Sequence, residues 1–114
     1  MLAEKIIYLK IIKMPPSKEK IIQTIFNSID EVNKILAEEM RVEKSEEAIL
    51  AGENGILDSL GLINFMVEVE GRIQKDFGFE INLIEALDSP DNPMDSIGQL
   101  VEFIALQGNN KNLE

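Results

Sequence analysis

Residues 58–78 read DSLGLINFMVEVEGRIQKDFG and carry a helical pattern from end to end. Either Asp58 or Ser59 can begin this helix, and Gly78 is a natural stop because glycine readily adopts the left-handed backbone at a helix end. The apolar residues recur at intervals of three and four, the spacing of one helix face: Leu60, Ile63, Met66, Val67, Val69 and Ile73. The stretch therefore predicts a helix that ends at Phe77.

A second helical pattern lies N-terminal to this one. Ser17 follows two prolines and is suited to cap a helix, which we expect to run to about Met40. Residues 41–55 are polar, have no clean period and end in a Gly-Glu-Asn-Gly turn, so they predict a long loop. The apolar stripe of this helix comprises Ile21, Ile22, Ile25, Phe26, Ile29, Val32 and Leu36.

Two further helices are expected after Gly78. Asn82 caps a brief one that ends at Leu87, and Asp95 or Ser96 caps a final one. No stretch predicts a convincing strand. The fold class is therefore all-α, a small bundle of three main helices and a short fourth. The stripe of the final helix is Ile97, Leu100, Val101 and Ile104.

The predicted helical domain spans residues 17–106. Residues 1–16 form an N-terminal extension whose Ile-rich pattern fits a helix and a strand about equally, so its structure stays open. Lysines interrupt its apolar residues, and it therefore predicts neither a signal peptide nor a membrane span. Residues 107–114 are expected to form a flexible tail.

Composition excludes several kinds of site. The 114 residues include no cysteine and no histidine, so the chain offers no disulfide, no thiolate metal ligand and neither of those side chains for catalysis. A net charge of −10 argues against nucleic acid as a partner. The whole excess of acidic residues lies in residues 41–114. Such an excess attracts basic surfaces of other proteins. Absence of cysteine fits a reducing compartment, and we expect a cytoplasmic protein.

Ser59 is the candidate functional residue. A helix N-terminus leaves its first N–H groups unpaired and carries a partial positive charge, so a phosphate attached to Ser59 would be stabilised there. The simpler interpretation is that Asp58 or Ser59 only caps the helix. The string Asp-Ser-Leu does not by itself decide between the two.

The surroundings of Ser59 add a resemblance. Gly55-Ile56-Leu57 leads into Asp58-Ser59-Leu60-Gly61, and a long helix then runs to Phe77-Gly78-Phe79-Glu80-Ile81. In motif and in the order of its helices, the chain resembles the acyl carrier protein family over residues 17–106. The resemblance implies a 4′-phosphopantetheine arm on Ser59 that holds acyl or aminoacyl groups as thioesters. It also implies a carrier that is not itself an enzyme.

The same resemblance places partner contacts on the helix that follows Ser59. The implied partners are a phosphopantetheinyl transferase, an acyl- or aminoacyl-loading ligase, and acyltransferase or synthase enzymes, and we expect a monomer. Ile63 and Val67 could instead be core, and with Ile81 they are candidates to line an apolar interior for cargo. Glu68 and Glu70 could simply form a solvated face. The implied contact residues are Asp58, Leu60, Ile63, Val67, Glu68 and Glu70.

Several features depart from the family pattern. The helix after Ser59 is about one turn longer than usual, contains Gly71, and has basic residues in its second half. These features suggest a specialised carrier. Gly55, Leu57 and Gly61 resemble the attachment region of D-alanyl and other aminoacyl carriers, so fatty acid, polyketide and nonribosomal peptide biosynthesis all stay open as pathways.

Three other readings compete with a carrier. A Gly-Asp-Ser-Leu esterase is excluded because Leu57 replaces the glycine and no histidine can act as base. A calcium loop over residues 91–102 has acidic ends, but Ser96 stands where such a loop needs glycine. The third is a cofactor-free acidic helical adaptor that docks on a basic protein partner, with Ser59 as a cap.

Overall fold

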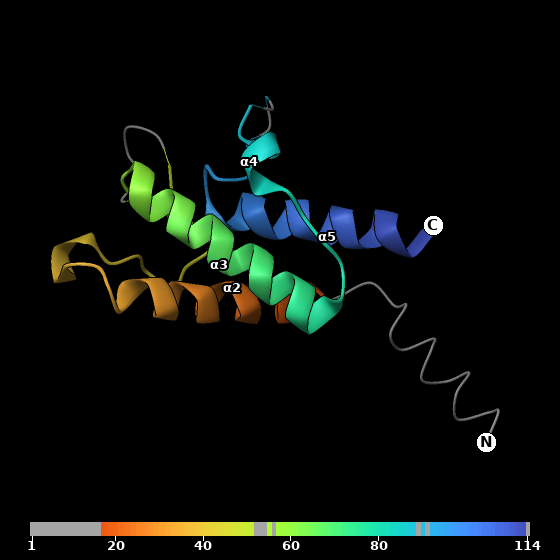
Figure 1. Cartoon of the computed structure of the whole chain (residues 1–114), viewed down its shortest axis with the longest axis horizontal. Coiled ribbons are helices and arrows are strands. Elements are labelled where there is room, and N and C mark those ends of the chain that lie inside the picture. The colour runs from red at the N-terminus through yellow and green to blue at the C-terminus, as the bar shows by residue number, and fades with distance from the viewer. Residues whose placement is uncertain (1–16, 52–54, 56, 89, 91, 114) are drawn as a thin grey trace, which may run out of the picture.

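A computed structural model describes the chain at residues 17–51, 55, 57–88, 90 and 92–113, and the predicted extension at residues 1–16 lies outside them. α2 packs against both α3 and α5, and α4 lies against α3 (Figure 1). Within the described residues the predicted all-α bundle is confirmed. Its elements are α2 (Lys18–Asn33), the 3-10 helix η1 (Glu38–Met40), α3 (Ser59–Phe77), α4 (Leu83–Ala86) and α5 (Ile97–Leu113).

The hydrophobic core lies where the three main helices turn their apolar stripes toward one another. Phe65 is the largest of the fully buried side chains. Burying a side chain of this kind is worth roughly 1.5–3 kcal/mol relative to leaving it in water, so this core accounts for most of what holds the helices together. The buried apolar side chains of the main helices are Ile21, Ile25, Ile29 and Val32 in α2, Phe65, Met66, Val69 and Ile73 in α3, and Ile97, Leu100, Val101 and Ile104 in α5.

The predicted end of α3 and the predicted start of α4 are confirmed, and α4 ends at Ala86, one residue before the predicted Leu87. α3 ends at Phe77, and Gly78 follows in the left-handed conformation with φ 77°, its N–H donating to the Gln74 carbonyl at 3.0 Å. Asn82 caps α4 because its side-chain oxygen accepts a hydrogen bond from the Glu85 N–H at 3.1 Å. A β-carbon at Gly78 would require a backbone conformation that other residues rarely adopt.

The first helix is shorter than predicted. α2 ends at Asn33 rather than near Met40, and only a turn and η1 follow it. The Asn33 side chain donates to the Val42 carbonyl and accepts from the Val42 N–H, each at 2.9 Å. Because Val42 is buried, this two-sided contact draws the chain back onto the domain and ends the helix.

The last helix is longer than predicted. We expected a tail at residues 107–114, but α5 continues through Leu113. Gly108 follows Ile104 by one turn, and both residues are buried. The packed face of α5 therefore extends past the point where the sequence looks like a polar tail. Within the described residues, no helix is both long enough and apolar enough to cross a membrane.

The long loop is anchored to the start of α5. Leu50 is fully buried, and its N–H donates to the Asp95 carbonyl at 3.3 Å. Ile49 and Ser96 form an isolated antiparallel bridge. The middle of the loop is therefore held against the start of α5.

Candidate functional site

The candidate site is the N-terminus of α3, where Asp58 and not Ser59 caps the helix. The Asp58 Oδ1 accepts a hydrogen bond from the Gly61 N–H at 2.8 Å, and the Asp58 carbonyl accepts one from the Leu62 N–H at 2.8 Å. Ser59 is the first residue of the helix and is exposed. Among the described residues, none forms a hydrogen bond with the Ser59 hydroxyl.

The start of α5 repeats the Asp-Ser sequence but uses it differently. The Ser96 Oγ accepts a hydrogen bond from the Gln99 N–H at 3.2 Å, so Ser96 is the cap among the two predicted candidates, Asp95 and Ser96. The first two amides of α5 also have acceptors in the long loop. The Ile97 N–H donates to the Ala48 carbonyl at 3.1 Å, and the Gly98 N–H donates to the Glu46 carbonyl at 2.9 Å. Every donor of this first turn is occupied.

The first turn of α3 is open by comparison. Helix geometry gives the Ser59 and Leu60 N–H groups no acceptor within their own helix, and no described residue accepts from either of them. These two donors and the positive end of the helix dipole lie beside the exposed Ser59 hydroxyl. The arrangement can therefore stabilise a negatively charged group that is attached to Ser59.

Two neighbours fix the backbone at this helix start. Leu57 is 8% exposed and anchors the residue before the cap in the core. Gly61 is buried, and a β-carbon there would lie 3.2 Å from the Asp58 Oδ1 and 3.3 Å from the Leu57 Cδ2. Glycine thus allows the capping carboxylate and the buried leucine to approach the helix closely. These two contacts hold Ser59 at a defined position on the surface.

Three of the predicted contact residues form an exposed apolar face on α3. Leu60 is 69% exposed, Ile63 48% and Val67 58%. The suggestion that Ile63 and Val67 line an apolar interior is therefore wrong, because both side chains point to solvent on a helix whose opposite face fills the core. Ile81 is half-buried and packs against the core.

The two predicted glutamates have partners within the chain. The Glu68 Oε1 accepts a hydrogen bond from the Arg72 Nε at 2.6 Å. The Glu70 Oε2 accepts from the Leu83 N–H at 2.9 Å and so holds the start of α4 against α3. Both glutamates are half-buried. Their observed contacts stabilise the arrangement of the helices, and their contact with partner proteins stays a prediction.

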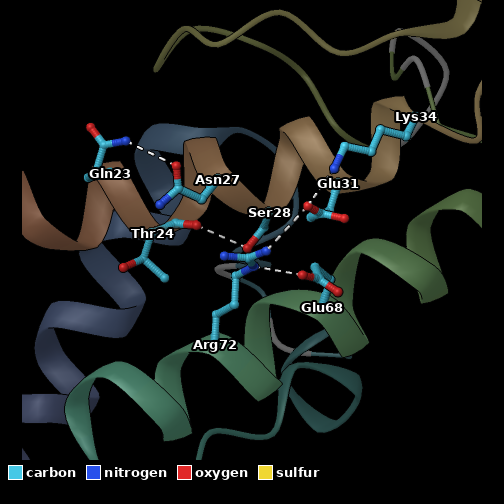
Figure 2. Close-up of polar contacts among 8 residues, drawn as sticks. All are labelled: Gln23, Thr24, Asn27, Ser28, Glu31, Lys34, Glu68 and Arg72. Atoms are coloured by element: carbon cyan, nitrogen blue, oxygen red, sulfur yellow. Dashed lines mark hydrogen bonds and ion pairs between the residues drawn. The ribbon is translucent and has the colours of Figure 1, made fainter.

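An ionic network that sequence reasoning missed joins α2 to α3. Arg72 lies between Glu68 on its own helix and Glu31 on α2, with the Arg72 Nη2 3.8 Å from the Glu31 Oε1 (Figure 2). The Lys34 Nζ lies 2.8 Å from the same Glu31 oxygen. The hydrogen bond and charge of Lys34, with a smaller contribution from Arg72, lower the pKa of Glu31. The spacing of Glu68 and Arg72 by four residues was the available signal.

The calcium reading gains no support from the described residues, which include no cluster of three acidic, histidine or cysteine side chains that could hold a metal ion. Asp91, at the start of the considered loop, lies outside them. Glu102, at its end, forms an ion pair with Lys18. That carboxylate instead links the starts of α2 and α5.

Comparison with known proteins does not place the chain in a family. No protein-family model, no curated protein and no solved structure matches it.

Proposed function

We propose that the protein is a carrier that is modified on Ser59 with 4′-phosphopantetheine and presents acyl or aminoacyl groups to partner enzymes. The observation that carries the proposal is the difference between the two Asp-Ser helix starts. At α5 the serine is the cap, whereas at α3 Asp58 is the cap, and the exposed Ser59 hydroxyl forms no hydrogen bond with any residue that the structure describes. Because Ser59 does not cap α3, its hydroxyl is available for modification.

The residues around Ser59 fit the proposed group. The attached phosphate would lie beside the Ser59 and Leu60 N–H groups, for which the described residues offer no acceptor, and beside the positive end of the helix dipole, which together favour an anion. The arm supplies a thiol that can hold cargo as a thioester, which a chain with no cysteine lacks. In the attachment step, the Ser59 Oγ would form a bond to the β-phosphorus of coenzyme A while the bond from that phosphorus to the bridging diphosphate oxygen breaks. The leaving group would be 3′,5′-ADP, and the hydroxyl proton would pass to the transferase.

The exposed apolar face of α3 supports the presentation part of the proposal. Leu60, Ile63 and Val67 follow Ser59 along the helix and offer partner enzymes an apolar surface beside the arm. We expect the phosphopantetheinyl transferase and the loading ligase to contact this face. The acidic charge of the domain favours partners with basic surfaces and speeds their encounter.

Intact-mass measurement tests the proposal. The purified protein is incubated with coenzyme A and a broad-specificity phosphopantetheinyl transferase, beside Ser59→Ala and Ser96→Ala. We expect wild type and Ser96→Ala to gain one phosphopantetheinyl group each and Ser59→Ala to gain none. Ser96→Ala is a matched control because it removes the other serine that follows an aspartate at a helix start. A gain of mass by Ser59→Ala would refute the assignment.

The exposed apolar face also favours a second candidate function, a cofactor-free adaptor that docks on a basic protein. In that case Ser59 is not modified. The mass of the wild type should then stay unchanged after incubation with a transferase that modifies another carrier in the same assay. Loss of binding to a captured basic partner on Leu60→Ser, in protein that was never modified, would then support the adaptor.

A further inference from the structure

One row of residues leads along α3 away from Ser59. Residues four apart in a helix lie on successive turns and form a continuous ridge on its surface. Starting at Ser59, this ridge passes through Ile63 and Val67 and reaches Gly71. We call these four residues the Ser59 row. All four are exposed, so the whole row faces solvent.

The row ends in a notch. Gly71 has no side chain, and a β-carbon built there would meet no atom within 4 Å. Shallow open hollows lie on its two sides. Besides Gly71, one is bordered by Glu70, Gln74, Glu80 and Ile81, and the other by Val67, Glu68, Arg72, Lys75 and Asp76. Gly71 is the one residue that borders both hollows. A glycine inside a helix costs about 1 kcal/mol relative to alanine, and one benefit it can bring is close approach of another group to the backbone.

We propose that the phosphopantetheine arm on Ser59 rests along the Ser59 row with its thiol end in the notch at Gly71. This inference rests on the proposed function and adds a resting site to it. The twelve residues from Ser59 to Gly71 rise by roughly 18 Å along the helix axis, a span comparable with the extended arm. Ile63 and Val67 are exposed and offer apolar contact to the dimethyl part of the arm.

The proposal has a consequence for partner binding. The resting arm covers Ile63 and Val67, the residues that partner enzymes are expected to contact. A partner that docks on this face must displace the arm, and displacement delivers the thiol to the partner. The surface would thus hold the arm between reactions and release it on docking.

Backbone amide spectra of the apo-protein and of the modified protein test the contact. We expect modification to shift the amides of Ile63, Val67 and Gly71 as well as those of the first turn. Shifts confined to the first turn, in a sample whose mass shows full modification, would overturn the resting site and leave the proposed function intact. Failure to gain mass at all would overturn the proposed function itself, so the two failures are distinguishable.

The reactivity of the thiol provides an independent measurement. An arm that rests on the row about 90% of the time should react with a bulky thiol reagent about tenfold more slowly than free pantetheine. Gly71→Gln fills the notch and should restore most of the free rate. Asn64→Gln, an exposed residue of α3 outside the row, is the control and should keep the slow rate. Equal rates for wild type and Gly71→Gln would also overturn the resting site.

Discussion

Removing the Asp58 carboxylate should destabilise the domain, whereas removing the Ser59 hydroxyl should not. Asp58→Ala leaves the buried Gly61 without its hydrogen-bond acceptor at 2.8 Å. Loss of such a cap costs about 1 kcal/mol, within a range of roughly 0.5–2 kcal/mol. For a small domain, each 1 kcal/mol lowers Tm by roughly 4–8 °C. Ser59→Ala removes an exposed hydroxyl with no described hydrogen bond and should stay within about 0.5 kcal/mol of wild type.

Urea unfolding of the apo-proteins measures these differences, provided that the variants share one m-value. Asp58→Asn keeps an acceptor oxygen and should recover most of the loss. Ser96→Ala should cost about 1 kcal/mol, because Ser96 is the cap of α5. If Ser59→Ala proved as destabilising as Asp58→Ala, Ser59 would share the capping role and the reasoning that frees its hydroxyl would be wrong.

Three further predictions follow from the contacts. Gly71→Ala should stabilise the domain by up to about 1 kcal/mol in thermal unfolding, because its β-carbon meets open space; a loss of stability would contradict this. Leu50→Ala should cost about 2–5 kcal/mol, as for a core residue, whereas the half-exposed Ile49→Ala control should cost far less. Lys34→Met should raise the pKa of Glu31 toward its ordinary value in a carboxyl NMR titration. Because that pKa is lowered in the folded state, the stability linked to Glu31 is present above the unfolded pKa and is lost as pH falls through the folded one.

The sequence was sufficient where one local signal agreed with the apolar period. The stripe of α3 and Gly78 together defined a helix that ends at Phe77, since only glycine readily takes the required backbone. Asn82 identified the start of α4 in the same way. In both cases the deciding interaction lies within a few residues, so it is visible in the order of the chain.

The features that were missed depend on contacts between distant residues. The end of α2 is set by the pairing of Asn33 with Val42, and nothing in the helical stripe marks that residue as a stop. Leu50 lies in a stretch of mostly polar residues, and its burial could not be predicted because it depends on contacts with the start of α5. The ion pair between Arg72 and Glu31 likewise needs the antiparallel packing of α2 on α3.

The candidate site shows both situations. Asp58 and Ser59 were each capable of capping α3, and only the geometry assigns the cap to Asp58. Ile63 and Val67 were equally compatible with the core and with the surface. They lie at the edge of a wide apolar stripe, and the sequence does not show whether residues at such an edge are buried or exposed. Their exposure follows from how α3 is rotated over α2, which a single helix cannot reveal.

Peptide mapping of the modified protein identifies which serine carries the phosphopantetheinyl group. After incubation with coenzyme A and an active transferase, tryptic digestion separates the two Asp-Ser helix starts, since cleavage after Lys44 and Arg72 releases residues 45–72, and cleavage after Lys75 and Lys111 releases residues 76–111. We predict one phosphopantetheinyl group, carried by Ser59 in the first peptide. A group on the second peptide, or none on either with a transferase that modifies another carrier, would contradict the account.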